Sequence, residues 1–248
     1  MAMYATGLWS EMDEAVQRAK HRRRVEDPAS PMGAEVLEAE PGRSFELQDP
    51  TSNVPVQRPL NMDWAAANVL HFFGGSEEAG ALREYNPNAG RFLTGDRWVG
   101  AYGVAARPQV DRCVELLRRC PSTRRAVVSM PGLSEMQDAN QPPCWSTMHF
   151  LHYDGCLDLL VYQRSLNLVG VMPYDCILFC NALLYVAEET GLGVGVLRWT
   201  VGSLHIPVGA AFPAGRGDPK HGLHLPASVL RDPAACRACL EDRKLWTW

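Results

Sequence analysis

Cys144 is the residue whose setting in this sequence most strongly suggests chemistry. It follows Pro142 and Pro143 and precedes "WSTMHF", a run with the composition of a strand. A residue at the end of a strand is displayed on a rigid scaffold, which suits a catalytic group. A cysteine by itself is more often a small buried apolar residue, so the surrounding motifs must decide between the two interpretations.

Arginines lie on both sides of Cys144 in the chain. Arg124 and Arg125 precede it, and "QRS" at 163–165 follows it, with "PYD" at 173–175 and "SLH" at 203–205 further on. A guanidinium near a thiol lowers the pKa of that thiol, and it also binds a phosphate through paired hydrogen bonds. The combination predicts a reactive thiolate beside a phosphate-bearing ligand.

The elements that must position these residues follow from the apolar periodicity. Helices are predicted at 8–24, at 61–75 with Asn61 or Asp63 as N-cap, at 108–121 and, apolar on nearly every face, at 174–191. Strands are predicted at 34–47 (as two short strands broken at Pro41-Gly42), 124–130, 144–153, 156–172 and 194–209. Residues 83–103 predict a long loop, and residues 213–248 a polar, proline-containing tail.

Composition limits the class of protein. With 248 residues, 46% of them apolar, the chain can bury one large core, so we expect a single α/β or α+β domain over 1–248. The net charge is −4 and the basic residues are scattered, so nucleic acid is not expected as a partner; "KHRRR" at 20–24 is taken as a solvated helix end. No signal peptide or membrane span is predicted, and the eight cysteines are expected to be reduced thiols in the cytoplasm.

With these motifs in order, the sequence resembles the thymidylate synthase superfamily, folate-dependent enzymes that modify C5 of pyrimidine nucleotides. The resemblance runs from about residue 34 to residue 206 and rests on "GAYG", "STRRAVVS", "PPC", "YQRS", "PYD" and "VGSLH". Their intervals agree with the family pattern, with no gap needed between Arg125 and Asp175. The resemblance implies an α/β (α+β) fold, a large mixed sheet covered by helices around a central buried helix, and a homodimer formed through the sheet.

The resemblance also implies a thiolate mechanism with 5,10-methylenetetrahydrofolate as cofactor. Cys144 would add to C6 of the pyrimidine, and C5 would then attack the one-carbon unit. The residues implied to bind the nucleotide phosphate and shape the thiolate's surroundings are Gln163, Arg164 and Ser165, joined by Arg124 and Arg125 from the partner subunit. Apart from the resemblance, the last two arginines would be taken as surface charge.

Asp175 is expected to select the base. Thymidylate synthases have an asparagine at this place in the motif, which suits uracil. Cytosine presents an amino donor and an unprotonated N3, which a carboxyl that shares a proton fits better. The same substitution marks the phage-type deoxycytidylate hydroxymethylases, so a cytosine nucleotide, CMP or dCMP, is predicted. Asp175 would also serve as the N-cap of the following helix.

The resemblance favours hydroxymethylation over methylation. In the hydroxymethylases water, rather than hydride from the folate, adds to the methylene intermediate. The synthases shield that intermediate with a tryptophan ahead of the "YG" motif, and the nearest large groups expected here are Phe92 and Leu93. The alternatives are C5 methylation, as in a cytidylate methylase or thymidylate synthase, and a catalytically silent nucleotide-binding paralogue.

Three positions depart from the family pattern. His205 keeps the sugar-binding histidine, but Pro207 replaces a tyrosine and offers no donor, which makes a ribonucleotide plausible. Asn68 falls where the family has a glutamate for proton transfer; an amide orients water but exchanges no proton. Tyr102 keeps its place in the "YG" motif. The acids considered as replacements for that glutamate are Glu77, Glu78, Glu84 and Asp175.

The folate contacts are expected near the end of the strand at 156–172. Asn167 replaces a family aspartate that contacts the folate, and Gly170 and Tyr174 are implied to lie beside it. No metal is expected: "HGLH" at 221–224 and "CRAC" at 236–239 fit no common zinc pattern. His149 and His152 are taken as packed histidines rather than partners of Cys144. The candidates for the phosphate-binding arginine that the family carries near its N-terminus are Arg22 to Arg24.

Overall fold

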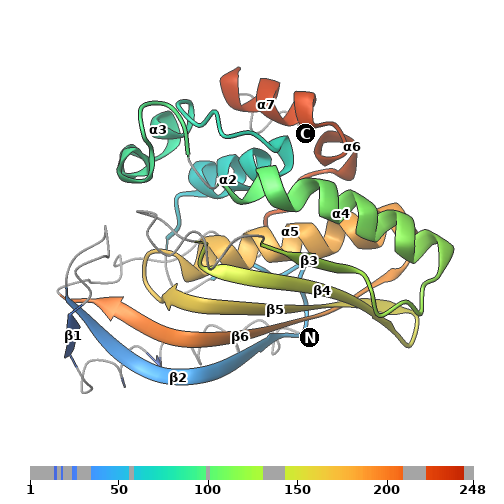
Figure 1. Ribbon diagram of the computed structural model, residues 1–248, viewed down its shortest axis with the longest axis horizontal. Coiled ribbons are helices and arrows are strands. Elements are labelled where there is room, and N and C mark those ends of the chain that lie inside the picture. The colour runs from blue at the N-terminus through green and yellow to red at the C-terminus, as the bar shows by residue number, and fades with distance from the viewer. Residues whose placement is uncertain are drawn as a thin grey trace.

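The computed structural model describes residues 14, 15, 18, 24–26, 35–55, 59–98, 101–130, 143–208 and 222–242. Within them the chain forms one mixed sheet with helices on one face (Figure 1). The strands, in the order in which they lie side by side, are β1 (Arg24–Glu26), β2 (Glu35–Leu47), β6 (Gly193–Pro207), β5 (Cys156–Asn167), β4 (Trp145–Tyr153) and β3 (Val127–Ser129). The predicted fold class is confirmed.

Only the pair of central strands is parallel. β5 and β6 run in the same direction, and every other neighbouring pair is antiparallel. β4 and β5 form a hairpin through Asp154 and Gly155, whose φ angles of 50° and 81° are those of a tight hairpin turn. The parallel connection from β5 to β6 passes through α5 (Met172–Thr190), as such a connection requires.

Helix α5 is the centre of the molecule. It lies directly on the sheet, and α2 (Met62–Gly74) and α4 (Tyr102–Arg119) lie over it (Figure 1). Because it is covered on both sides, nearly every side chain from Met172 to Ala187 is buried, as the continuous apolar sequence predicted. Gly191 ends the helix in the left-handed conformation (φ 70°). The N-terminal turn of α5 is therefore fixed against the sheet.

Helix α2 begins and ends where the sequence predicted. The Asn61 side chain accepts a hydrogen bond from the Trp64 N–H (2.9 Å), and Gly75 ends the helix at φ 59°. α2 packs closely on the start of α4, where a Cβ added to Gly103 would lie 2.2 Å from the carbonyl oxygen of Phe72. Only glycine permits this approach, which brings the two helices into contact beside Tyr102.

Several element predictions were wrong. β2 is one continuous strand, because the register passes across Pro41 and Gly42 after an irregularity between Glu38 and Glu40. α4 begins at Tyr102 rather than at Pro108, which lies inside the helix. The predicted loop at 83–103 contains helical turns, α3 (Leu82–Tyr85) and η1 (Pro87–Phe92).

The two ends of the chain are only partly described. The predicted tail contains α6 (Ala227–Leu230) and α7 (Pro233–Glu241), of which α7 packs on α2. Of the helix predicted at 8–24, Glu14, Ala15 and Arg18 are helical, but Arg24 begins β1; Arg22 and Arg23 lie outside the described residues. Among the described helices, none combines the length and apolarity needed to cross a membrane.

The buried guanidinium of Arg107 connects α4 to the C-terminal helices. Arg107 is 4% exposed and donates hydrogen bonds to the carbonyl oxygens of Phe73 (3.0 Å), Leu230 and Arg231 (2.8 Å), and it pairs with Asp111. We expect Arg107→Met to lower the free energy of unfolding by about 3 to 5 kcal/mol, because these buried acceptors lose their donor.

The matched control is Arg112→Met on the same helix, where the side chain is 70% exposed. It should change the free energy of unfolding by less than about 0.5 kcal/mol in urea denaturation. Equal effects of the two substitutions would contradict the structural role of Arg107.

Candidate active site

Cys144 lies immediately before β4, and its backbone is held from two sides. Its N–H donates a hydrogen bond to the Tyr102 hydroxyl (2.9 Å), and its carbonyl accepts one from the Arg164 N–H (2.8 Å). The Arg164 side chain in turn donates from Nε to the carbonyl of Pro143 (2.9 Å). The first turn of α4 and the end of β5 thus fix the position of the cysteine.

Asp175, in the first turn of α5, is the buried acid of this site. Its Oδ2 accepts a hydrogen bond from Gln163 Nε2 (2.9 Å), while Gln163 Oε1 accepts one from Trp199 Nε1 (3.1 Å). Gln163 Nε2 also donates to the Ser165 carbonyl (3.1 Å), so this buried side chain is held on three sides and orients Asp175. The helix-cap interpretation of Asp175 was wrong, because the N-cap position is Val171 and no side chain caps it.

The electrostatics around Cys144 differ from the expectation. Burial raises the pKa of the Cys144 thiol, and the neighbouring Asp175 charge raises it further. Arg164 and the hydrogen bond with Tyr102 lower the pKa of Cys144, as an arginine was expected to do, but these effects are outweighed. The thiolate form of Cys144 is consequently more stable when Asp175 is protonated and neutral than when Asp175 is charged.

Burial raises the pKa of both Asp175 and Tyr102. Burial raises the pKa of the Asp175 carboxyl to about 7, against a smaller lowering by the Gln163 hydrogen bond. Burial, followed by the charges of Cys144 and Asp175, raises the pKa of Tyr102 well above its ordinary value. Near neutral pH, Tyr102 remains a proton donor, and Asp175 is balanced between acid and base.

The raised pKa of Asp175 predicts a pH-dependent stability. Between about pH 4 and about pH 7 the folded protein retains a proton that the unfolded chain has lost, so the free energy of unfolding falls as the pH rises through this window. Asp175→Asn removes the effect and should stabilise the fold by up to about 4 kcal/mol at pH 8 and by less at pH 5.

Thermal unfolding at both pH values measures this difference. Asp154→Asn, at an exposed turn, is the matched control and should change the free energy of unfolding by less than about 0.5 kcal/mol. An Asp175→Asn protein with the same stability difference at pH 5 and pH 8 would contradict the buried, protonated carboxyl.

One face of α2 turns toward the cysteine. The Phe72 ring lies 6.4 Å from the Trp145 ring, the His71 ring stacks with Trp98 at 5.7 Å, and Tyr102 contacts both Trp98 (6.4 Å) and Trp145 (5.3 Å). On a helix, position 68 lies between positions 71 and 72 when viewed down the axis. Half-buried Asn68 therefore faces the region of Tyr102.

Trp98 and His71 are residues that the sequence reasoning missed. Trp98 also stacks with Phe92 (5.9 Å, 18°), so the large group beside Tyr102 is a tryptophan rather than Phe92 or Leu93 alone. The signal was an aromatic residue four positions before Tyr102. Burial lowers the pKa of His71 to about 4, so its ring is neutral, and its Nε2 has no hydrogen-bond partner among the described residues.

The acids proposed to replace the family glutamate lie on the outer side of this region. Glu77 pairs with Arg97, and Glu78 and Glu84 are exposed. Of the four acids considered, Asp175 is the one that interacts electrostatically with Cys144.

The residues expected at the folate contact lie between β5 and α5. Asn167 is buried, and its Oδ1 accepts hydrogen bonds from the N–H groups of Val169 and Gly170 (3.0 Å each). Gly170 is exposed, and the Tyr174 hydroxyl accepts a hydrogen bond from the Asn61 N–H (3.3 Å). The side-chain carbonyl of Asn167 is thus engaged by N–H groups of its own loop. The side-chain NH₂ group of Asn167 remains as a donor.

His205 and Ser165 occupy neighbouring strands of the same region. In the parallel register, Asn167 lies opposite His205 and Ser165 opposite Ser203. These four residues come after Gln163 in β5 and after Val201 in β6. Because Gln163 pairs with Trp145, the residue after Cys144, they lie toward the same end of the sheet as Cys144. Because alternate side chains of a strand share a face, Ser165 and Asn167 of β5 lie beside Ser203 and His205 of β6 on one face of the sheet.

Arg124 and Arg125 lie far from Cys144 in the same chain. The β3–β4 register pairs Val127 with His149, which places Arg125 beside Leu151, seven residues along β4 from Cys144. At about 3.3 Å per residue this separation is about 23 Å. Both arginines are exposed, near the end of α4, and line a hollow of about 540 Å³. Within one chain, they cannot reach a ligand held at Cys144.

The zinc-like motifs have ordinary packing roles where they are described. Buried Cys236 donates to the Val229 carbonyl (3.4 Å), and the His224 ring contacts the Thr51 carbonyl (2.8 Å); His221 lies outside the described residues. No group of three or more metal-binding side chains occurs within the described part of the chain.

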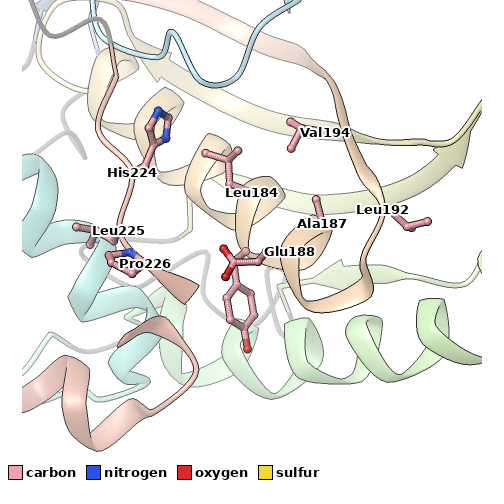
Figure 2. Close-up of a pocket in the computed structure, with 9 residues that line it drawn as sticks. Leu184, Ala187, Glu188, Leu192, Val194, His224, Leu225 and Pro226 are labelled. Carbon is pink, nitrogen blue, oxygen red and sulfur yellow. The ribbon is translucent and has the colours of Figure 1, made fainter. Parts of the chain in front are cut away.

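A second hollow lies on the far half of α5. Figure 2 shows it between α5, the start of β6 and the segment at 224–226. Its volume is about 430 Å³. It is lined by Leu184, Tyr185, Ala187, Glu188, Leu192, Val194, His224, Leu225 and Pro226. Because Asp175 is in the first turn of α5 and Leu184 is nine residues further along, this hollow is separate from the candidate active site.

The fold and the site define an α/β protein that presents a cysteine at a strand end, beside an arginine, a neutral tyrosine and a buried acid. The family model of thymidylate synthase matches residues 42–208, which include all of these groups, and the chain belongs to that family. Membership implies one-carbon transfer to C5 of a pyrimidine nucleotide, with a folate cofactor. The chain is also similar in structure to thymidylate synthase from T4 phage, with a TM-score of 0.64 and 21% identity over 84% of this chain and 77% of that one.

Proposed function

We propose that this protein hydroxymethylates C5 of a cytosine nucleotide, CMP or dCMP, with methylenetetrahydrofolate as the one-carbon donor. The observation that carries the proposal is the Asp175 carboxyl, which is buried, fixed by Gln163 and has a pKa of about 7. A carboxyl with that pKa can accept from the cytosine amino group and share a proton with N3. A uracil ring, with N3–H and O4, lacks this match.

Cys144 is the proposed nucleophile. Its Sγ forms a bond to C6, the electrons of the C5=C6 bond make C5 a carbon nucleophile, and the proton shared by Asp175 and N3 stabilises the resulting charge. The same proton removes the Asp175 charge that disfavours the thiolate, so binding of the base and activation of Cys144 are coupled. Arg164 supports the thiolate, and Tyr102 stays protonated to donate a hydrogen bond.

The polar groups at the end of β5 suit the donor. The Asn167 amide N–H groups are available to a carbonyl or ring nitrogen of a pterin, and Gly170 has no side chain to obstruct it. Methylenetetrahydrofolate, when bound, supplies the one-carbon unit. Asn68, on the face of α2 toward Tyr102, is proposed to orient the water whose oxygen adds to the one-carbon unit and completes the hydroxymethyl group. Because an amide accepts no proton, the proton that this water loses passes to solvent.

The proposal includes a homodimer. All of the described helices from α2 to α7 lie on one face of the sheet (Figure 1), and Tyr162, on the other face, is 47% exposed. Arg124 and Arg125 lie too far from Cys144 to act in their own chain, so we propose that they bind the phosphate in the partner's site. The eight free thiols support a reducing compartment such as the cytoplasm.

Methylation is the second candidate, and Trp98 is the observation that favours it. A tryptophan in contact with Tyr102 can exclude water from an intermediate formed on Cys144. A catalytically silent paralogue is the third, because Asn68 cannot transfer a proton.

Product masses distinguish the three candidates. The protein is incubated with methylenetetrahydrofolate and, separately, CMP, dCMP, UMP and dUMP. A hydroxymethyl gain on a cytosine nucleotide, with release of tetrahydrofolate, is expected. A methyl gain with dihydrofolate would assign the water-excluding role to Trp98, and binding without turnover would indicate the silent paralogue.

A further inference from the structure

Glu38 of β2 lies beside His205 on the surface of the candidate site. The antiparallel register pairs the two residues directly, so their side chains lie on the same face of the sheet, with Cβ atoms about 5 Å apart. On the other side of His205, the parallel register supplies Asn167. Three polar residues from three neighbouring strands therefore form one row, with Glu38 as its acid.

A local irregularity and a hydrogen bond fix Glu38 there. The register passes from Glu38–His205 to Glu40–Leu204, so one extra residue of β2 forms a bulge next to Glu38. Bulges commonly re-aim a neighbouring side chain. Ser203 Oγ donates to Glu38 Oε1 (3.3 Å), and Ser203 lies two residues before His205 on the same face of β6. One carboxylate oxygen is held by this bond, and Oε2 is the second acceptor.

We propose that Glu38 binds the sugar of the nucleotide and accepts a hydrogen bond from its 2'-hydroxyl, so that the preferred substrate is the ribonucleotide. This inference rests on the proposed function for the presence of a cytosine nucleotide at His205. In dinucleotide-binding folds an Asp or Glu carboxylate binds the ribose 2'-hydroxyl in this way. Pro207, two residues beyond His205, has no donor, so sugar recognition falls on Glu38 and His205.

The deoxy substrate loses the hydrogen bond to Glu38. Without the 2'-hydroxyl, Oε2 of this half-buried carboxylate has no donor from the sugar, while Ser203 still donates to Oε1. Sites built to hydrogen-bond a hydroxyl discriminate strongly against analogues that lack it. Because Glu38 is only partly buried, we expect a preference of about 10- to 100-fold for CMP over dCMP.

The test compares dissociation constants, by calorimetry, and kcat/KM for CMP and dCMP in the wild type, Glu38→Gln and Glu38→Ala. Glu38→Ala should lower affinity and kcat/KM for CMP to the values for dCMP and leave those for dCMP within about twofold; Glu38→Gln, which retains one acceptor oxygen, should be intermediate. Glu46→Gln is the matched control: it removes the same charge from the same strand, eight residues away, at the exposed pair with Arg198.

The two proposals fail in different ways. Equal binding of CMP and dCMP by the wild type, or a CMP/dCMP ratio that Glu38→Ala leaves unchanged, would overturn the role of Glu38 whatever the reaction. Selective binding of CMP that is lost in Glu38→Ala, without a hydroxymethyl product, would support Glu38 and overturn the proposed reaction.

Discussion

Cys144→Ala should lower kcat by at least about 10⁴-fold and leave nucleotide binding within a fewfold of wild type. The proposed reaction begins with a bond from Sγ to C6, which an alanine side chain cannot form. Binding should survive because the backbone N–H and carbonyl of residue 144, which hold Tyr102 and Arg164, are retained.

A covalent trap separates the nucleophile from a structural cysteine. A 5-fluorinated cytosine nucleotide with methylenetetrahydrofolate should give an adduct on Cys144, visible by mass spectrometry of the intact protein. The matched control is Cys120→Ala, at the exposed end of α4, which should react like the wild type. Turnover by Cys144→Ala near the wild-type rate would remove Cys144 from the mechanism.

Asp175→Asn should change the preferred base from cytosine to uracil. We expect kcat/KM for the cytosine nucleotide to fall about 100- to 1000-fold, because the amide cannot share a proton with N3. Activity on the uracil nucleotide should rise, since the amide carbonyl accepts from N3–H and its N–H donates to O4. Gln163 can still donate to the new Asn carbonyl, so the site keeps its geometry.

The pH profile tests the same group independently. With the pKa of Asp175 near 7, kcat/KM of the wild type for the cytosine nucleotide should fall as the pH rises above about 7, because the shared proton is lost. The profile of Asp175→Asn on the uracil nucleotide should lack that descending limb. A limb that persists unchanged in Asp175→Asn would assign the titration to another group and contradict the proposed base recognition.

Local sequence signals correctly predicted the helices and the hairpin whose ends are set by residues at those ends. Asn61 and Gly75 delimit α2, the Asp154-Gly155 turn joins β4 to β5, and the apolar run ending at Gly191 gave the central helix. These features depend on nearest neighbours along the chain: a cap, a positive φ or a continuous apolar surface. β2 was misassigned because its pairing with β6, a contact between distant segments, maintains a strand across Pro41 and Gly42.

The electrostatic state of the site came from tertiary packing. Motif order identified Cys144, Arg164 and Asp175, but it predicted a thiol pKa lowered by arginine. Burial and the charge of Asp175 reverse that direction, and both depend on α5 lying against the end of β5.

The sequence by itself determined the family resemblance and indicated Cys144 as the proposed nucleophile and the acid at position 175, because these reside in short motifs with fixed spacing. Only the tertiary structure revealed that Gln163 orients Asp175, that Trp98 lies against Tyr102, that Arg125 is remote from Cys144 and that Glu38 lies beside His205. The physical reason is common to all four: they are contacts between segments far apart in the chain, and strand register and helix packing, rather than sequence spacing, decide which side chains meet.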